Sequence, residues 1–399
     1  MEPSQSKSRK ERSFRERRST VDTVSQLWDA MVVGAGPAGC AAAYDLAAAG
    51  QSVLLLDKHD FPRPKACAGG LTMKAVRALR YSIDPVVRQV MRRVQLEGAD
   101  SLHPDPLSTV LQSREPICVM TVRAELDEFC LRKTIAAGAC FRRISPVRQI
   151  VRSGDDVHLL TDGALYRARF LIGADGASGQ VRRLCADGSW FSRGFALEVK
   201  TAMPKDGSGL IFDFAGVSNG YAWIFPKGDH LNVGVYSPSS TAGVTRSRLL
   251  GYVKARLGTD AVDHVVGQYL GIGAGCCQAE DVQPDLRDRV FLVGDAGGFV
   301  DPLTGEGIYG ALLSGQAAAA AVLSETRGAG AAEEAFASYL ADYRHTLRFS
   351  SRAAAAFYAN PARGFRAMRF PLVRRTLVRT YTHGLNVKSL AMRIALSHC

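Results

Sequence analysis

The spacing of apolar residues changes along the chain, and each change predicts a different kind of element. A short apolar run at 31–33 is followed by a glycine-rich turn, an alanine-rich stretch at 40–49 and a second apolar run at 53–56. Strand, turn, helix and strand in this order predict a βαβ unit. Apolar runs at 170–172 and 290–293 each end in a Gly/Asp-rich turn. We therefore expect distant parts of the chain to supply strands to one domain.

Other patterns divide the rest of the chain. Alternating apolar and polar residues at roughly 186–280 predict an antiparallel sheet inserted into the first domain. The first domain is then discontinuous, with the segments 28–185 and 281–350. After Gly305 the chain is alanine-rich and helical to about residue 358, and prolines interrupt it at 361 and 371. The predicted fold class is α/β, with a Rossmann-type domain, an inserted β-sheet domain and a helical C-terminal region at 351–399.

Charge is concentrated at the two ends. The 399 residues have a formal charge of +12, of which 1–20 carry +4 and 352–399 carry +9. The near-neutral body excludes a broad nucleic-acid-binding face, which needs Lys and Arg spread through the fold. Residues 1–27 are polar and have few apolar anchors, so we expect a flexible basic tail.

Compartment and metal chemistry follow from what the sequence lacks. It contains no apolar stretch of the roughly 18 to 20 residues that cross a bilayer and no signal-peptide core, so we expect a cytoplasmic protein. The nine cysteines form no C-x-x-C pair and no Cys/His cluster at metal spacing. Reduced thiols and no metal site are therefore expected.

The first glycine turn has the features of a dinucleotide site. It reads Gly34-Ala-Gly36-Pro-Ala-Gly39, and Asp57 follows 18 residues after Gly39. Gly34 permits the tight turn, Gly36 lets backbone N–H groups approach a pyrophosphate, and Gly39 allows close packing of helix on strand. Asp57 would accept hydrogen bonds from ribose hydroxyls. With a strand before it and a helix after it, the motif predicts dinucleotide binding without separating FAD from NAD.

Two later turns narrow the choice of cofactor. They read Ile-Gly-Ala-Asp-Gly-Ala-Ser at 172–178 and Val-Gly-Asp-Ala-Gly-Gly at 293–298, and the second runs into Asp-Pro-Leu-Thr-Gly-Glu-Gly at 301–307. These turns resemble those of a flavin-dependent group that includes aromatic hydroxylases, flavin halogenases and geranylgeranyl reductases. The resemblance implies FAD, with Asp295 at the ribityl chain and Arg123 beside the ribityl and pyrophosphate region; the alternative for Arg123 is a surface helix charge. The implied cofactor-binding residues are Gly34, Gly36, Pro37, Ala38, Gly39, Asp57, Lys58, Arg123, Asp175, Gly294, Asp295, Pro302, Gly305, Gly307 and Ile308.

Two further segments resemble geranylgeranyl reductases in particular. Residues 64–70 read Pro-Lys-Ala-Cys-Ala-Gly-Gly, similar to that family's P-x-K-x-C-G-G, although Ala68 replaces its usual glycine. Residues 221–226 read Tyr-Ala-Trp-Ile-Phe-Pro, similar to its Y-x-W-x-F-P. The resemblance covers about 28–350 and implies an FAD-dependent reductase that saturates carbon–carbon double bonds of a polyprenyl chain by hydride transfer from the reduced flavin.

The same resemblance implies the substrate side of the site. Tyr221, Trp223 and Phe225 recur at period two and so share one strand face, which is either ordinary core or the wall of a prenyl tunnel. Cys67 borders the flavin in the family and is the nearest candidate for a catalytic acid; the alternative is a small buried thiol. Lys65 could hold a phosphate or diphosphate head group, or be a solvated loop lysine.

Other functions of the same fold stay open at this point. A flavin monooxygenase acting on a lipophilic small molecule is the main alternative, although hydroxylases usually have histidine after Gly-Asp-Ala, where Gly297 stands here. Halogenases have tryptophan at the position of Tyr221, and a third class is a non-catalytic membrane-associated flavoprotein. No second G-x-G-x-x-G directly follows an apolar strand run, so NADPH would bind transiently or ferredoxin would act as a redox partner protein.

The basic C-terminal region suggests contact with a membrane. Residues 352–399 interleave apolar side chains with Lys and Arg and contain no acidic residue. Such a helical segment can anchor a protein at an anionic lipid surface, each basic residue contributing on the order of 1 kcal/mol. We therefore expect peripheral membrane association, the alternative being a domain-closing helical hairpin with solvated arginines.

Overall fold

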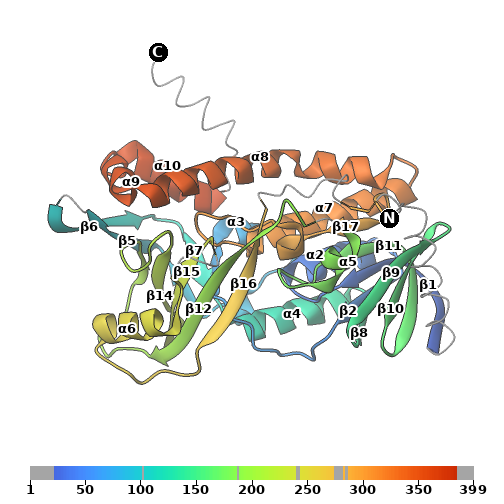
Figure 1. Ribbon diagram of the computed structural model, residues 1–399, viewed down its shortest axis with the longest axis horizontal. Helices are drawn as coiled ribbons and strands as arrows, with labels where there is room; N and C mark the ends of the chain where they lie inside the picture. The colour runs from blue at the N-terminus through green and yellow to red at the C-terminus, as the bar shows by residue number, and fades with distance from the viewer. Residues whose placement is uncertain are drawn as a thin grey trace, which may run out of the picture.

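The computed structural model describes residues 22–100, 103–186, 188–239, 243–273, 282–283 and 286–383. Two seven-stranded sheets form the body, and the helices α8, α9 and α10 follow one another along one side of it (Figure 1). The expected mixture of sheets and helices is therefore present.

The first sheet assembles the strands predicted from four distant apolar runs. Its order is β8-β2-β1-β11-β10-β9, and β17 pairs with β11. The pairs of β1 with β2 and β11, and of β11 with β17, are parallel. The strands span β1 Asp22–Val33, β2 Val53–Asp57, β8 Cys140–Arg143, β9 Val147–Ser153, β10 Asp156–Thr161, β11 Ala164–Gly173 and β17 Val290–Leu292.

Helices rich in small residues cover one face of this sheet. They are α2 (Pro37–Ala48), α4 (Arg123–Ala136) and α7 (Ile308–Thr326), and short α5 (Gln180–Cys185) lies on the other face. A Cβ on Gly315 of α7 would lie 2.2 Å from the Ala38 carbonyl oxygen of α2. The alanine and glycine positions thus let these two helices approach closely over the sheet.

The second sheet differs in one respect from the predicted division of the chain. Residues 93–112, which fall within the predicted 28–185 segment, form two of its strands, and β5 pairs in parallel with β13, so the sheet is mixed. The local pattern at 93–112 does not show which sheet these strands join, because their partner strand β13 lies over 100 residues further along the chain. In spatial order the strands are β16 Val266–Ile272, β12 Ser192–Ala202, β15 His230–Ser237, β14 Tyr221–Pro226, β13 Leu210–Asp213, β5 Arg93–Asp100 and β6 His103–Gln112.

Smaller elements and the C-terminal helices complete the fold. The three-stranded sheet β3 (Gly70–Thr72), β7 (Cys118–Met120) and β4 (Gln89–Met91) lies with α3 (Met73–Ala78), the 3-10 turns η1 (Asp84–Val86) and η3 (Gly294–Gly297), and α6 (Arg246–Leu257). The chain then forms α8 (Ala332–Ala359), α9 (Pro361–Ala367) and α10 (Pro371–His383). The breaks predicted at Pro361 and Pro371 are confirmed: each proline occupies a first helical position, where its missing N–H costs no hydrogen bond.

Two predicted boundaries shift. β1 begins at Asp22, so residues 22–27 belong to a strand although the sequence places them in the basic tail; residues 1–21 lie outside the described part of the chain. α8 runs through the predicted boundary at 351, because alanine continues its helical pattern there. Residues 384–399 of the basic C-terminal region also lie outside the described part.

Candidate functional site

Three turns meet at one edge of the first sheet, because parallel strands place their carboxyl ends together. They follow β1, β11 and β17. Gly34 has φ of 105°, and a Cβ there would lie 2.3 Å from the Ala174 carbonyl oxygen of the second turn. Gly294 of the third turn has φ of 56° and would place a Cβ 2.9 Å from that of Ala38. Glycine is therefore required at both positions by conformation and by space.

The N-terminus of α2 faces a cavity. Gly36 is its N-cap and makes no side-chain capping hydrogen bond, and the nearest atom to a Cβ there would be Nη2 of Arg63, at 3.8 Å. The Asp57 carboxylate accepts the N–H groups of Ala35 at 2.8 Å and His59 at 2.9 Å, which fixes it at the end of β2. An uncapped helix N-terminus beside open space is suited to a phosphate group.

The loop at 301–307 is held by hydroxyl groups from the second sheet and α8. Tyr221 donates to the carbonyl oxygen of Thr304, and Tyr236 donates to that of Pro302 at 3.1 Å. Tyr358 of α8 donates to a third carbonyl oxygen of the loop. The loop leads into α7, whose N-cap Gly307 has no side-chain capping bond. A second uncapped helix N-terminus therefore lies at this end of the cavity, in a fixed position.

Arg123 is buried rather than a surface charge. Its guanidinium donates to both carboxylate oxygens of Asp127 at 2.9 Å, and Nη2 of Arg63 lies 3.4 Å from the same carboxylate. Burial opposes the charge on Arg123, but Asp127 outweighs it and keeps the pKa above its ordinary value. Arg123 also hydrogen-bonds the thiol of Cys67. It thus connects the first turn region with the 64–70 loop.

Lys65 and Asp295 face each other across this end of the cavity. Burial raises the pKa of the Asp295 carboxyl, while Lys65 opposes the rise. Burial, with Arg123 close by, lowers the pKa of Lys65. The charged neighbours of Lys65 thus include two residues predicted for the cofactor, Arg123 and Asp295, and it is not a solvated loop lysine.

One cavity of about 1090 Å³ unites most of the predicted site. All five predicted catalytic and substrate-binding residues line it, and so do most of the predicted cofactor-binding residues. Gly39 and Pro302 are the exceptions: Gly39 packs against the Gly34 carbonyl oxygen, and Pro302 is buried behind the loop. The predicted cofactor-binding residues that line the cavity are Gly34, Gly36, Pro37, Ala38, Asp57, Lys58, Arg123, Asp175, Gly294, Asp295, Gly305, Gly307 and Ile308.

One wall of the cavity is apolar and aromatic. Tyr221, Trp223 and Phe225 of β14 form one wall together with Phe212 of the neighbouring strand. The opposite face of β14 packs against α6, so the strand is buried on both sides. The period-two interpretation is confirmed in its geometry: the three aromatic side chains share the face that borders the cavity.

A buried polar chain joins this aromatic wall to the 64–70 loop. Trp223 Nε1 donates to Asn232 Oδ1 at 2.7 Å, Asn232 hydrogen-bonds the Glu198 carboxyl, and the backbone N–H of Cys67 donates to that carboxyl. Burial raises the pKa of Glu198, which also lines the cavity. Asn232 and Glu198 were not among the predicted site residues. Their positions on adjacent strands are a signal visible only once the register of β12 and β15 is known.

Lys227 holds the 64–70 loop from behind. Its side chain is buried, and its Nζ donates to the Ala68 carbonyl oxygen. Burial lowers its pKa from 10.5 to about 8. Asp175, in contrast, accepts the N–H of Val181 at 2.9 Å, and burial raises the pKa of its carboxyl. Both charged groups therefore support the turns that carry the site.

Comparison with known proteins identifies the family. The sequence model of the FAD-dependent oxidoreductases matches residues 29–108. Digeranylgeranylglycerophospholipid reductase 3 of Methanosphaera stadtmanae is 31% identical over 335 residues, covering 79% of this chain and 82% of that protein. The chain belongs to the geranylgeranyl reductase family of FAD-dependent oxidoreductases. The menaquinone reductase of Mycolicibacterium smegmatis is 30% identical over 315 residues, covering 73% of this chain and 75% of that protein.

Solved structures show the same fold. A geranylgeranyl bacteriochlorophyll reductase-like protein from Thermoplasma acidophilum superposes with a TM-score of 0.73 at 19% identity, covering 93% of this chain and 99% of that one. A halogenase solved with FAD gives a TM-score of 0.66 at 16% identity, covering 84% of this chain and 76% of that one. The resemblance seen in the sequence is therefore confirmed, and FAD is the cofactor of this fold family.

The described residues fit FAD. The uncapped N-terminus of α2, the open space at Gly36 and the carboxylate of Asp57 provide what a pyrophosphate and a ribose require. Among the described residues no group of His, Cys, Asp and Glu side chains could hold a metal ion. Within the same part of the chain no helix is long and apolar enough to cross a membrane.

Proposed function

We propose that the protein is a reductase that uses FAD to saturate carbon–carbon double bonds of a polyprenyl, geranylgeranyl-type substrate. The observation that carries this proposal is the continuity of the cavity from the three glycine turns to the aromatic wall of β14. This wall offers aromatic and aliphatic side chains, which suit an isoprenoid chain and offer little to a polar substrate. The names of the two relatives support a prenyl chain, whether in a lipid or in a quinone tail.

The chain's own residues position the double bond and control access of water. Bound FAD in its reduced form would supply the hydride. Tyr221, Trp223 and Phe225 hold the prenyl chain against the cofactor end, and their fixed rotamers limit its motion. Cys67 stays our proposed proton donor, because its thiol lines the cavity beside Arg123. Glu198 holds the backbone of Cys67 in place and acts as a positioning residue.

Electrons reach the cofactor from NADPH or ferredoxin in this proposal. No second G-x-G-x-x-G directly follows an apolar strand run in the sequence, so NADPH would bind only transiently. A ferredoxin would dock as a redox partner protein. Steady-state assays of the purified protein with each donor distinguish these two sources.

Peripheral membrane association is part of the same proposal. Phe370 and Leu372, at the corner between α9 and α10, are 65% and 60% exposed, and Arg366 and Arg369 flank them. Exposed apolar side chains beside arginines suit the boundary between lipid head groups and acyl chains. Co-sedimentation with anionic vesicles at low salt should recover the protein in the pellet, and replacement of Phe370 and Leu372 by Ser should release it. Wild-type protein that stays in the supernatant would contradict the association.

The proposed activity is tested by mass spectrometry of lipids from cells with and without the protein. We expect isoprenoid species whose masses differ by two hydrogens per saturated double bond. Identical isoprenoid profiles in cells that produce the folded, FAD-loaded protein would contradict the proposal.

A further inference from the structure

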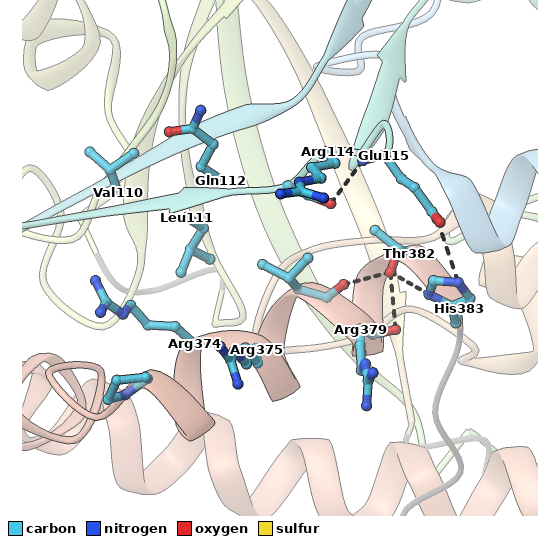
Figure 2. Close-up of a pocket in the computed structure, with 13 residues that line it drawn as sticks. Val110, Leu111, Gln112, Arg114, Glu115, Arg374, Arg375, Arg379, Thr382 and His383 are labelled. Carbon is cyan, nitrogen blue, oxygen red and sulfur yellow. Dashed lines mark hydrogen bonds and ion pairs between the residues drawn. The ribbon is translucent and has the colours of Figure 1, made fainter.

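We call the cavity of about 1090 Å³ the prenyl cavity. A second hollow lies beside it, between the end of β6 and α10. It has a volume of about 1010 Å³. We name it the basic groove. Figure 2 shows Leu111 pointing from β6 toward α10, with the loop after β6 on one side and the helix on the other. Its lining residues are Val110, Leu111, Gln112, Ser113, Arg114, Glu115, Pro371, Arg374, Arg375, Val378, Arg379, Thr382 and His383.

The basic groove has a strong excess of positive charge. Arg374, Arg375 and Arg379 come from α10 and Arg114 from the loop opposite, against the single carboxylate of Glu115 (Figure 2). No carboxylate within the described part of the chain forms an ion pair with any of these four arginines. Four guanidinium groups in one groove therefore have no anionic partner among the described residues.

The nearest basic side chains to Glu115 are not the four arginines of the groove. Nε2 of His383 lies 3.7 Å and Nη2 of Arg77 lies 4.0 Å from the Glu115 carboxylate. Thr382 at the same end of α10 hydrogen-bonds Nδ1 of His383 at 2.7 Å. The carboxylate therefore lies beside His383 and Arg77, and three or more of the groove arginines keep an unbalanced charge.

The basic groove adjoins the prenyl cavity along α10. Leu111 and Val378 line both hollows. Val373, Leu377 and Tyr381 recur every four residues along α10, so they share one helix face, and all three line the prenyl cavity. The arginines of the same helix line the groove instead. One helix thus separates an apolar chain site from an anionic site.

We infer that the basic groove binds the phosphate ester head group of the substrate whose prenyl chain occupies the cavity. This inference rests on the proposed function. A single carboxylate would leave most of the positive charge unbalanced, whereas a phosphate or diphosphate carries more charge, and its oxygens match the forked donors of arginine. A quinone head group has neither the negative charge nor the phosphate oxygens that these arginines would bind. Lys65 is then not the head-group residue, since its charged neighbours are Arg123, Asp295, Arg63 and Asp127.

The test compares geranylgeranyl phosphate with geranylgeraniol in detergent micelles that contain no bilayer. The FAD-loaded enzyme is kept reduced by excess dithionite under anaerobic conditions, and KM and kcat are measured for each substrate. The groove variant is Arg374→Gln/Arg375→Gln/Arg379→Gln. For this variant we expect KM for the phosphate to rise about tenfold or more, because charge-assisted hydrogen bonds are lost. KM for the alcohol and both kcat values should stay within about twofold of wild type.

A matched control removes the same charge away from both hollows. Arg132→Gln/Arg142→Gln/Arg246→Gln changes three exposed arginines that line neither the groove nor the prenyl cavity. This control should leave both KM values unchanged. A second groove variant, Glu115→Gln, should lower KM for the phosphate. Equal effects of the groove variant on both substrates, or no effect on either, would overturn the inference.

Two further measurements separate the other outcomes. Phosphate groups of membrane lipids are the alternative source of the same chemistry; in that case the groove variant would lose binding to phosphatidylglycerol vesicles while its micellar KM stayed unchanged, which overturns the inference. Calorimetric binding of phytanyl phosphate needs no turnover. If wild-type enzyme reduces neither substrate but binds phytanyl phosphate through the groove arginines, the proposed function fails and the head-group site stands.

Discussion

Replacing Lys227 by methionine should stabilise the protein at neutral pH. The Lys227 side chain is 3% exposed, and burial lowers its pKa from 10.5 to about 8. This difference corresponds to about 3 kcal/mol of unfavourable free energy for keeping the lysine charged in the folded state. Methionine removes that cost but also removes the hydrogen bond to Ala68, worth about 1 kcal/mol. We therefore expect a net gain of about 2 kcal/mol at pH 7.

The sign of the pH dependence follows from the same values. Because the pKa of Lys227 is lower in the folded than in the unfolded protein, the folded protein releases its proton first as the pH rises. The buried charge on Lys227 therefore destabilises the folded protein fully below pH 8, and this effect is lost progressively as the pH rises toward 10.5. The unfolding free energy of wild type therefore gains a contribution over this interval that the Lys227→Met variant lacks. The difference in unfolding free energy between the two proteins should shrink as the pH rises from 8 to 10.5.

Urea denaturation followed by tryptophan fluorescence measures this difference. Wild type, Lys227→Met and the exposed control Lys205→Met are compared at intervals from pH 7 to 10.5. The control should run parallel to wild type at every pH. A Lys227→Met protein that is less stable than wild type at pH 7, or whose curve stays parallel to wild type, would refute the reasoning about the buried charge.

Three further substitutions test the supports of the cavity. Gly234→Ala would place a Cβ 2.1 Å from a ring carbon of Trp223, so its unfolding free energy should fall by about 2 kcal/mol in urea titrations. Arg123→Leu removes both short hydrogen bonds from the buried Asp127 carboxylate and leaves it only Arg63 at 3.4 Å, so it should cost about 3 kcal/mol with loss of bound FAD, measured by flavin absorbance. Glu198→Gln keeps an oxygen that can accept the backbone N–H of Cys67, whereas Glu198→Leu does not. The leucine variant should lose about tenfold in turnover, and the glutamine variant should retain far more. Unchanged values in these assays would contradict each assignment.

The cofactor end of the site was predictable because its chemistry is local in sequence. Each glycine turn directly follows an apolar strand, and parallel pairing brings the turns to one edge. Gly34 and Gly36 could therefore be assigned from spacing alone, although Gly39 proved to support the turn from outside the cavity. The conformation of a motif made of consecutive residues can be predicted from those residues without knowledge of distant contacts.

The remaining parts depend on contacts between distant segments. Asn232 and Glu198 form their polar chain only through the register of two strands, and nothing in either segment marks them. The same holds for β5 and β6, whose place in the second sheet is determined by the partner strand β13. The arginines of α10 were visible as a basic region, but their separation from the apolar face that lines the prenyl cavity required the helix position.

The central claim is that this flavoprotein reduces prenyl double bonds, and anaerobic flavin reoxidation tests it most directly. The FAD-loaded protein is photoreduced without oxygen and mixed with a geranylgeranyl compound, while flavin absorbance and product mass are followed. Return of the oxidised flavin spectrum together with a product heavier by two hydrogens is the predicted result. A flavin that stays reduced until oxygen is admitted, and then consumes oxygen in a substrate-dependent way, would contradict the claim and indicate a monooxygenase.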